Sequence, residues 1–245
     1  MPDLAAAYEQ TRRSMGDLVT PLDDDGRAAP VPACPGWTVQ DLVAHVTSVA
    51  VAVATGEFPP DLNPAAFWDD RTADLRERFV AEGLEHRRGR TIEEILDEWE
   101  LAAKDLEAMM RGERPWPEEA PVFPDWIVLT DLAVHHHDLR GALDAAGDRD
   151  SVATGLSLRS YIETMRIRAA IEKSSPFRIV AGSREWIIGE GEPAATVTAD
   201  PFELARAASG RRSPEQIRSY DWQGDPEPFL RFFYPYGPRS EALVE

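Results

Sequence analysis

The spacing of apolar and polar residues predicts helices through the first 148 residues. Apolar residues recur every three or four positions near the start of the chain, as at Leu4, Tyr8 and Met15, which is the period of an amphipathic helix. The same period returns in segments 67–81 and 125–146. We therefore expect four or five helices in an up-down bundle, a fold whose facing side chains can enclose a metal or cofactor.

Two further helices of this region have clear start signals. Thr38 is followed three residues later by Asp41, and Thr91 is followed by Glu94, so each pair matches a capping box. The first signal opens a helix over 38–54, in which His45 lies on a stripe of leucine and valine. The proline-rich and glycine-containing segment just before Thr38 is expected to be a loop.

The pattern changes at residue 149. A helical segment over 154–172 is followed by two short β-rich segments, 177–181 and 185–188, on either side of a Gly-Ser-Arg turn. A third strand over 195–199 and an Asp-Pro helix start over 200–203 come next. The sequence therefore predicts two domains, a helical bundle over 1–148 and a small α+β domain over 149–245.

The distribution of charge supports this division. The chain has 26 Lys and Arg against 44 Asp and Glu, a formal charge of −18, and residues 1–150 carry −17 of it (14 basic, 31 acidic). A field of this sign repels phosphate backbones and anionic lipid, so we expect neither nucleic acid nor membrane as a partner.

Cysteine content and apolar runs indicate a cytoplasmic protein. Cys34 is the single cysteine, so no internal disulfide is possible, and the first thirty residues lack the apolar core of a signal peptide. The longest strongly apolar stretch, Val43 to Ala54, is shorter than the roughly 20 residues of a membrane-spanning helix. We expect a monomer or a weak homo-oligomer.

Candidate chemistry lies with the histidines, because four of the five fall in two predicted helices, one at position 45 and three at 135–137. Asp131 and His135 are four residues apart and share a helix face. With His45 they make a three-ligand set that leaves a coordination position open, as catalytic zinc sites do. Asp138 is placed to accept a hydrogen bond from the spare nitrogen of a ligating histidine.

Simpler interpretations of the same residues stay open. Asp and His occur four apart in many helices, a lone buried histidine is more often a hydrogen-bonded core residue, and His136 and His137 can face solvent. A structural zinc site of four cysteines is excluded, because the chain has one.

Two segments resemble a known family. The segment from Pro32 to His45, with its Cys-Pro-Gly-Trp loop and its Asp-Leu pair before the histidine, resembles a signature of the mycothiol-dependent maleylpyruvate isomerase family, a branch of the DinB-like metal-binding bundles. The segment 131–140 is similar to the second motif of that family. Segments 199–213 and 220–225 resemble its sterol-carrier-like C-terminal domain, so the resemblance covers nearly the whole chain.

The resemblance implies a divalent metal ion, zinc in the first instance, held by His45, Asp131 and His135. It implies mycothiol as a thiol cosubstrate and a small electrophilic substrate, in either a thiol S-transferase or a cis-trans isomerase. Some members, including the isomerase, have Glu where this chain has Asp131, which reaches about one methylene less far. The resemblance also implies a C-terminal arginine at the site, and Arg211 matches it, with Arg140 on the metal-bearing helix as the alternative.

Two residues of the Cys-Pro-Gly-Trp loop need separate interpretation. Trp37 is a candidate cofactor-binding or substrate platform, weighed against a packing role at the helix start. Cys34 is expected to be a packed loop residue rather than a ligand or nucleophile, because it precedes the helix rather than facing the site.

Other functions stay open beside the enzyme. One alternative is a non-catalytic protein that binds a metal or small ligand in the bundle. Another is lipid binding, which would require an apolar cavity in residues 150–245.

Overall fold

The computed structural model describes residues 3–59 and 70–245. The chain divides into two compact units, one ending at Gly147 and also including Glu245, the other spanning Asp148–Val244. Each unit has its own core, and each is described by itself below.

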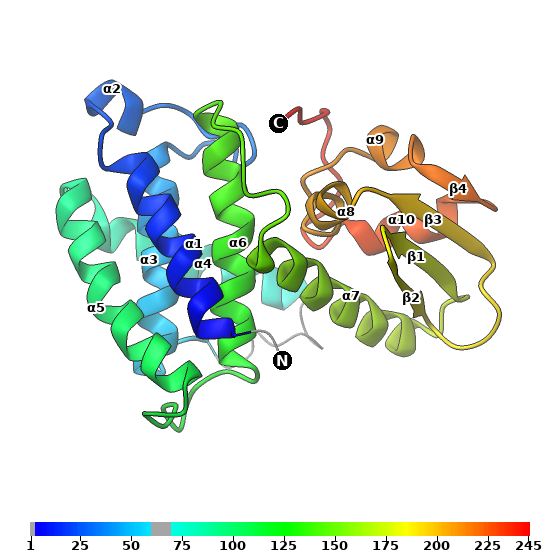
Figure 1. Cartoon of the computed structure of the whole chain (residues 1–245), viewed down its shortest axis with the longest axis horizontal. Helices are drawn as coiled ribbons and strands as arrows, with labels where there is room; N and C mark the ends of the chain where they lie inside the picture. The colour runs from blue at the N-terminus through cyan, green and yellow to red at the C-terminus, as the bar shows by residue number, and fades with distance from the viewer. Residues whose placement is uncertain (1–2, 60–69) are drawn as a thin grey trace. The chain divides into compact units, whose positions relative to one another are not determined.

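The first unit is helical. Among the described residues, four helices lie side by side, a fifth long helix packs on one of them, and a single short turn of helix lies beside the bundle (Figure 1). The four are α1 (Leu4–Val19), α3 (Val39–Thr55), α5 (Ile92–Met110) and α6 (Pro124–Ala142); α4 (Asp70–Arg87) packs on α3, and α2 (Asp24–Arg27) is the short one. The expected all-α bundle is confirmed.

Capping boxes begin two of these helices. The amide of Thr38 donates to Asp41 Oδ2 at 2.9 Å, while the Asp41 amide donates back to Thr38 Oγ1 at 3.1 Å. The pair Thr91 and Glu94 makes the same exchange at the start of α5. These bonds satisfy amides that have no partner within the helix, so the helix starts expected from the sequence are confirmed.

The limits of three helices differ from the prediction. Helix α6 ends at Ala142 rather than 146, because Asp144 takes a left-handed conformation (φ 50°) and Arg140 Nη1 donates to the Ala146 carbonyl at 2.9 Å. Helix α4 continues past 81 to Arg87, and positions 67–69 of its predicted start lie outside the described residues. The acidic turn before Gly26 is helical, since Asp23 caps α2 through the Gly26 amide at 2.9 Å.

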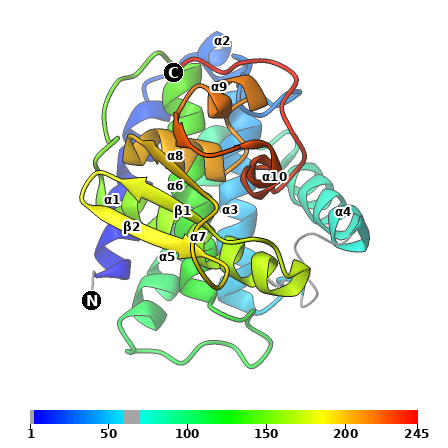
Figure 2. The same ribbon diagram turned by 90° about the vertical axis from the view of Figure 1, so that its right-hand side faces the viewer.

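The second unit is α+β, as expected. A four-stranded sheet in the order β2-β1-β3-β4 has β1 and β3 parallel and its two outer pairs antiparallel (Figure 1). Figure 2 shows β1 and β2 side by side, and α7 contacts both β2 and α8. Its elements are α7 (Val152–Glu172), β1 (Phe177–Ala181), β2 (Arg184–Ile188), β3 (Ala195–Ala199), α8 (Pro201–Ala208), α9 (Pro214–Arg218), β4 (Asp221–Gln223), α10 (Glu227–Leu230) and the 3-10 turn Arg231–Phe233. The hairpin and the third strand are confirmed, whereas β4 was not predicted.

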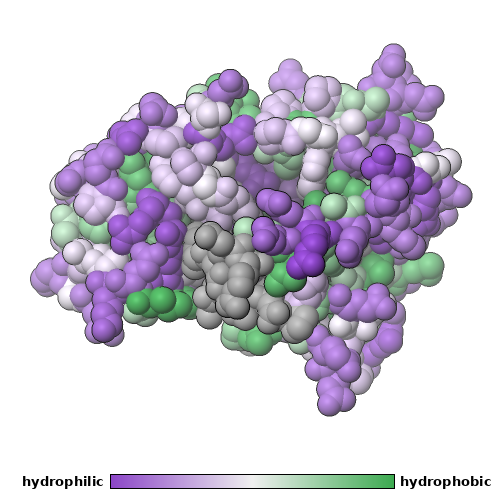
Figure 3. Space-filling model, turned by 180° about the vertical axis from the view of Figure 1, so that it is seen from behind, coloured by the Kyte–Doolittle hydropathy of each residue, from purple (hydrophilic) through white to green (hydrophobic). Residues whose placement is uncertain are grey.

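The surface is mostly polar. Figure 3 shows one face of the molecule on which hydrophilic residues predominate and hydrophobic residues form small separate groups. No helix in residues 3–59 and 70–245 is long and apolar enough to cross a membrane.

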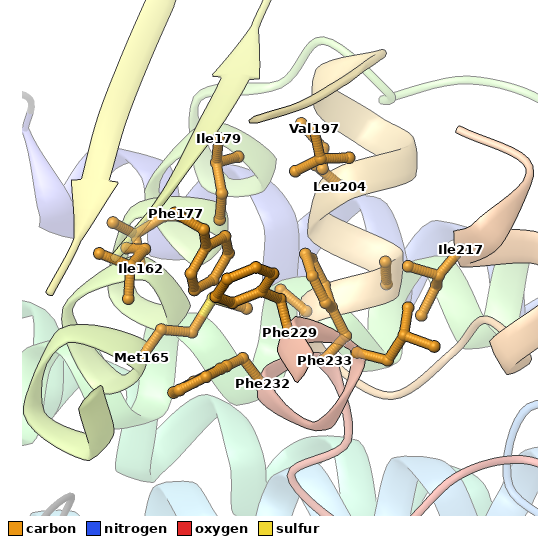
Figure 4. Close-up of a cluster of buried hydrophobic side chains, with 14 of the residues drawn as sticks. Ile162, Met165, Phe177, Ile179, Val197, Leu204, Ile217, Phe229, Phe232 and Phe233 are labelled. Carbon is orange, nitrogen blue, oxygen red and sulfur yellow. The ribbon is translucent and has the colours of Figure 1, made fainter. Parts of the chain in front are cut away.

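The core of the second unit is built largely from aromatic rings. Phe177 is fully buried on β1, and its ring centroid lies 4.8 Å from that of Phe229 and 5.3 Å from that of Phe232. Side chains from the sheet, the helices and the 3-10 turn meet there (Figure 4). These rings belong to one packed apolar cluster. The lipid-binding alternative stays a hypothesis.

Candidate metal centre

Helices α3 and α6 pack against each other and carry the candidate ligands. The capping box at Thr38 sets where α3 begins, and His45 follows in its second turn. Asp131 and His135 are one turn apart on α6, so their side chains leave the same face of that helix. The two helices therefore bring three candidate ligands together, although His45 is 86 residues from Asp131 in the sequence.

The three donor atoms converge on one point. Asp131 Oδ1 lies 3.3 Å from His45 Nε2 and 3.6 Å from His135 Nε2. One ligand atom from each residue lies within 4.8 Å of the other two. Both imidazoles are buried, while Asp131 is partly exposed.

These distances fit a small divalent ion. Zinc bonds to nitrogen and carboxylate oxygen are about 2.0–2.2 Å, so two ligands at tetrahedral positions lie about 3.4 Å apart. The separations of 3.3 and 3.6 Å from Asp131 Oδ1 are close to that spacing. Two imidazoles and one carboxylate are also a donor set that zinc accepts with a position left over.

Asp138 orients one of the two histidines. Its Oδ2 lies 2.9 Å from His135 Nδ1, and its side chain is fully buried. An Nδ1–H that donates to this carboxylate leaves the lone pair on Nε2, the atom that faces Asp131. Burial lowers the pKa of His135 below its ordinary value, although the two carboxylates oppose this effect, and this direction favours the neutral ring that binds metal.

His45 differs from His135 in this respect. Its Nε2 faces Asp131, but its Nδ1 is buried with no hydrogen-bond partner in the part of the chain that the structure describes. The ring of Trp37 packs against it instead, with centroids 4.9 Å apart. The same indole stacks on His135 at 5.8 Å and 28°, so Trp37 contacts both imidazoles.

The expectation for Cys34 was wrong in its premise. Cys34 does face the site, because its Sγ lies 3.3 Å from Asp138 Oδ2 and 3.8 Å from His135 Nδ1. With His135 and Asp138 it forms a second group of three potential donors. No sequence signal shows this contact, because it joins residues 104 apart and depends on how the loop folds.

The other two histidines of α6 are buried, so the solvent-facing alternative for His136 and His137 is wrong. His136 Nε2 lies 3.1 Å from Ser14 Oγ and accepts from Arg140 Nε at 3.2 Å. Arg140 also donates to Ser14 Oγ at 3.1 Å. The structure thus places Arg140 in a network that ties α6 to α1, beside rather than within the set of three ligands.

Arg211 lies in the second unit. It follows α8, is buried, and donates through Nη1 to the Ser209 carbonyl at 2.7 Å. Its assignment to the site stays a prediction.

A comparison with protein families matches most of the first unit. The sequence profile described as "Mycothiol maleylpyruvate isomerase N-terminal domain" matches residues 8–140, more than half of the chain. The chain belongs to this family. The matched region includes all three candidate ligands together with Cys34 and Asp138.

The fold agrees with that of solved structures. A crystal structure of a mutant of mycothiol-dependent maleylpyruvate isomerase superposes with a TM-score of 0.60 at 13% identity, covering 91% of this chain and 93% of the other. A second crystal structure of the isomerase gives 0.54 at 15% identity, covering 86% and 90%. Comparison with curated proteins returned no match. At these identities the likeness concerns the fold, so the reaction has to be argued from the residues.

Proposed function

We propose that this protein is a mycothiol-dependent metalloenzyme that acts on a small electrophilic substrate, as a thiol S-transferase or a cis-trans isomerase. The observation that carries the proposal is the convergence of His45, Asp131 and His135 at distances suited to one divalent ion, in a chain of the mycothiol maleylpyruvate isomerase family.

In this proposal the three ligands contribute two nitrogen donors and one carboxylate oxygen to the ion. His135 presents Nε2 in the neutral ring, and His45 presents Nε2 from the facing helix. Asp131 supplies the negative charge that offsets part of the charge of a divalent ion. When bound, zinc would supply an open coordination position at which a thiol loses its proton at neutral pH.

The remaining residues shape the place where the two substrates meet. Trp37 covers the two imidazoles with an apolar face, which limits access of water to the histidines. The chain contributes no nucleophile in this proposal, since mycothiol brings the sulfur that adds to the electrophilic carbon. Arg211, or in its place Arg140, is proposed to pair with a carboxylate of the substrate.

Metal analysis tests the site. Protein purified without a polyhistidine tag should contain about one equivalent of divalent metal, and His45→Ala and His135→Ala should each abolish stoichiometric binding. Two controls retain the three ligands: His86→Ala removes an exposed histidine of α4, and His137→Gln changes a buried histidine of α6. Equal binding by the ligand variants and the controls would refute this site.

Turnover separates the enzyme from the binding-protein alternative. Metal-loaded protein should consume mycothiol in the presence of a reactive electrophile, or isomerise an activated cis double bond only when mycothiol is present. Metal binding without thiol-dependent turnover, over a panel of electrophiles, would favour a protein that binds a metal or small ligand.

A further inference from the structure

Two groups of potential ligands meet at His135, one on each ring nitrogen. On the Nε2 side lie Asp131 and His45, and on the Nδ1 side lie Asp138 and Cys34. The imidazole of His135 can therefore bridge two metal sites, or it can bind one metal through Nε2 while its Nδ1 donates a hydrogen bond. The distances separate these interpretations.

The Nδ1 side is hydrogen-bonded. His135 Nδ1 and Asp138 Oδ2 are 2.9 Å apart, the ordinary length of an N–H···O bond and shorter than the roughly 3.4 Å between two zinc ligands. On the Nε2 side the corresponding distances are 3.3 and 3.6 Å. We therefore assign the metal to the Nε2 side and a hydrogen-bonded chain to the Nδ1 side.

Cys34 is the outer member of that chain. Its Sγ donates to Asp138 Oδ2, the same oxygen that accepts from His135 Nδ1. A reactive cysteine usually lies beside a cation or a helix N-terminus, which favours the thiolate. Here the sulfur lies instead beside a buried carboxylate and donates to it at 3.3 Å, which is the geometry of a hydrogen-bond donor.

The loop that carries Cys34 is closed by its own backbone. Val31 donates its amide to the Trp37 carbonyl at 2.9 Å, and the Trp37 amide donates to the Cys34 carbonyl at 3.0 Å. Gly36 has a φ of 87°, a conformation that favours glycine. A bridge pairs Pro30 with Thr38, directly before α3. The loop therefore holds Cys34 at a fixed place relative to the helix that bears His45.

We propose that Cys34 is a positioning residue of the metal centre, whose thiol orients Asp138 and through it the Nε2 atom of His135. This inference rests on the metal site of the proposed function, and it gives the Cys-Pro-Gly-Trp loop two tasks. Through Cys34 the loop binds Asp138, which orients His135, and through Trp37 it covers the imidazoles of His45 and His135.

Four variants separate hydrogen bonding from packing. Cys34→Ser keeps a donor of similar size, Cys34→Val fills the space without a donor, and Cys34→Ala removes both. Asp138→Asn keeps the shape of the carboxylate and removes its charge. Zinc affinity is measured by competition with a chelator, cobalt spectra report the ligands, and thermal unfolding of the metal-free forms reports folding.

Without mycothiol present, we expect Asp138→Asn to weaken zinc binding about 10- to 100-fold, as for other partners of ligating histidines. Cys34→Val and Cys34→Ala should each weaken it by a smaller factor, about 3- to 10-fold, and Cys34→Ser should stay within about twofold of wild type. The double variant of Cys34→Val and Asp138→Asn should bind no more weakly than Asp138→Asn alone, because both changes act through one carboxylate.

Several results would overturn the inference. Unchanged affinity in both Cys34→Val and Cys34→Ala would do so, as would an equal loss in Cys34→Ser, since a donor would then be irrelevant. A sulfur-to-cobalt absorption band that is present without mycothiol and lost in Cys34→Ser would make Cys34 a ligand instead. Failure of wild-type protein to bind metal would refute the site itself, whereas normal metal binding with an indifferent Cys34 would refute only its positioning role.

Discussion

The two units of this protein bury different kinds of side chain. Among the described residues, the helical unit buries four imidazoles, those of His45 and His135–His137, and the carboxylate of Asp138. The α+β unit buries three guanidinium groups, those of Arg206, Arg211 and Arg212, beside an apolar and aromatic cluster. Most of the negative charge also falls on the helical side, with −17 over residues 1–150 and −1 over 151–245. Imidazole and carboxylate groups can bind a divalent cation, whereas a guanidinium group only donates hydrogen bonds, so the contrast places the candidate metal ligands in the bundle.

The apolar core of the α+β unit should be the most sensitive to truncation. Phe177→Ala removes a fully buried ring that contacts Phe229 and Phe232, and we expect it to destabilise this unit by about 3–5 kcal/mol. Amide hydrogen exchange should accelerate in β1 and β3 and stay slow in α3 and α6. Zinc affinity should remain within about twofold of wild type. Equal acceleration in α3 and α6 would show that the two units unfold together.

Zinc binding should stabilise the helical unit. A ligand that binds only the folded state stabilises it by about 2.7 kcal/mol when its free concentration is 100 times the dissociation constant. We therefore expect zinc at that excess to slow amide exchange in α3 and α6 and to leave the strands unchanged. His135→Ala should abolish the effect. Slower exchange in the strands of wild-type protein would contradict the assignment of metal to the helical unit.

The capping boxes allow a smaller and more local comparison. Thr38→Ala and Thr91→Ala should each lower the free energy of unfolding of the helical unit by about 1 kcal/mol, because each removes a cap. Only Thr38→Ala should also weaken zinc binding, since α3 carries His45 and α5 carries none of the three ligands. A matching loss of affinity in Thr91→Ala would mean that affinity follows overall stability.

The smallest predicted effect concerns acid and the α+β unit. Hydrogen bonds from Arg212, at 2.7 and 2.9 Å, hold the pKa of Glu203 below its ordinary value. The stabilisation is therefore present above the unfolded pKa and is lost as pH falls through the folded one. Because Glu203 is about a third exposed, we expect this pH-dependent part to be about 1 kcal/mol or less. Urea unfolding between pH 6 and about pH 3 should show a shallower acid dependence in Glu203→Gln.

Local signals in the sequence predicted much of the fold. The capping boxes at Thr38 and Thr91 and the Asp-Pro start at Asp200 mark helix starts through bonds between neighbours in the chain. The end of α6 was misjudged, because Ala145 and Ala146 favour helix while Arg140 binds their carbonyl groups outside it. Strand β4 has three residues, too few to show an alternating pattern, and exists through its pairing with β3.

The candidate site could be predicted only in part, because some of its contacts join residues far apart in the sequence. The spacing of Asp131 and His135 follows from helix geometry, and Asp138 lies within one further turn, so those relations are local. The contact of Cys34 with Asp138 joins residues 104 apart in sequence and depends on how a loop closes. No spacing rule reports such a contact.

The most direct test of the account is the response of a cobalt-substituted protein to mycothiol. If His45, Asp131 and His135 hold the ion with one position open, one equivalent of mycothiol should produce a sulfur-to-cobalt absorption band in the near ultraviolet, and Cys34→Ser should show the same band. Absence of the band at saturating mycothiol, with cobalt still bound by those three residues, would contradict the central claim that this centre activates an external thiol.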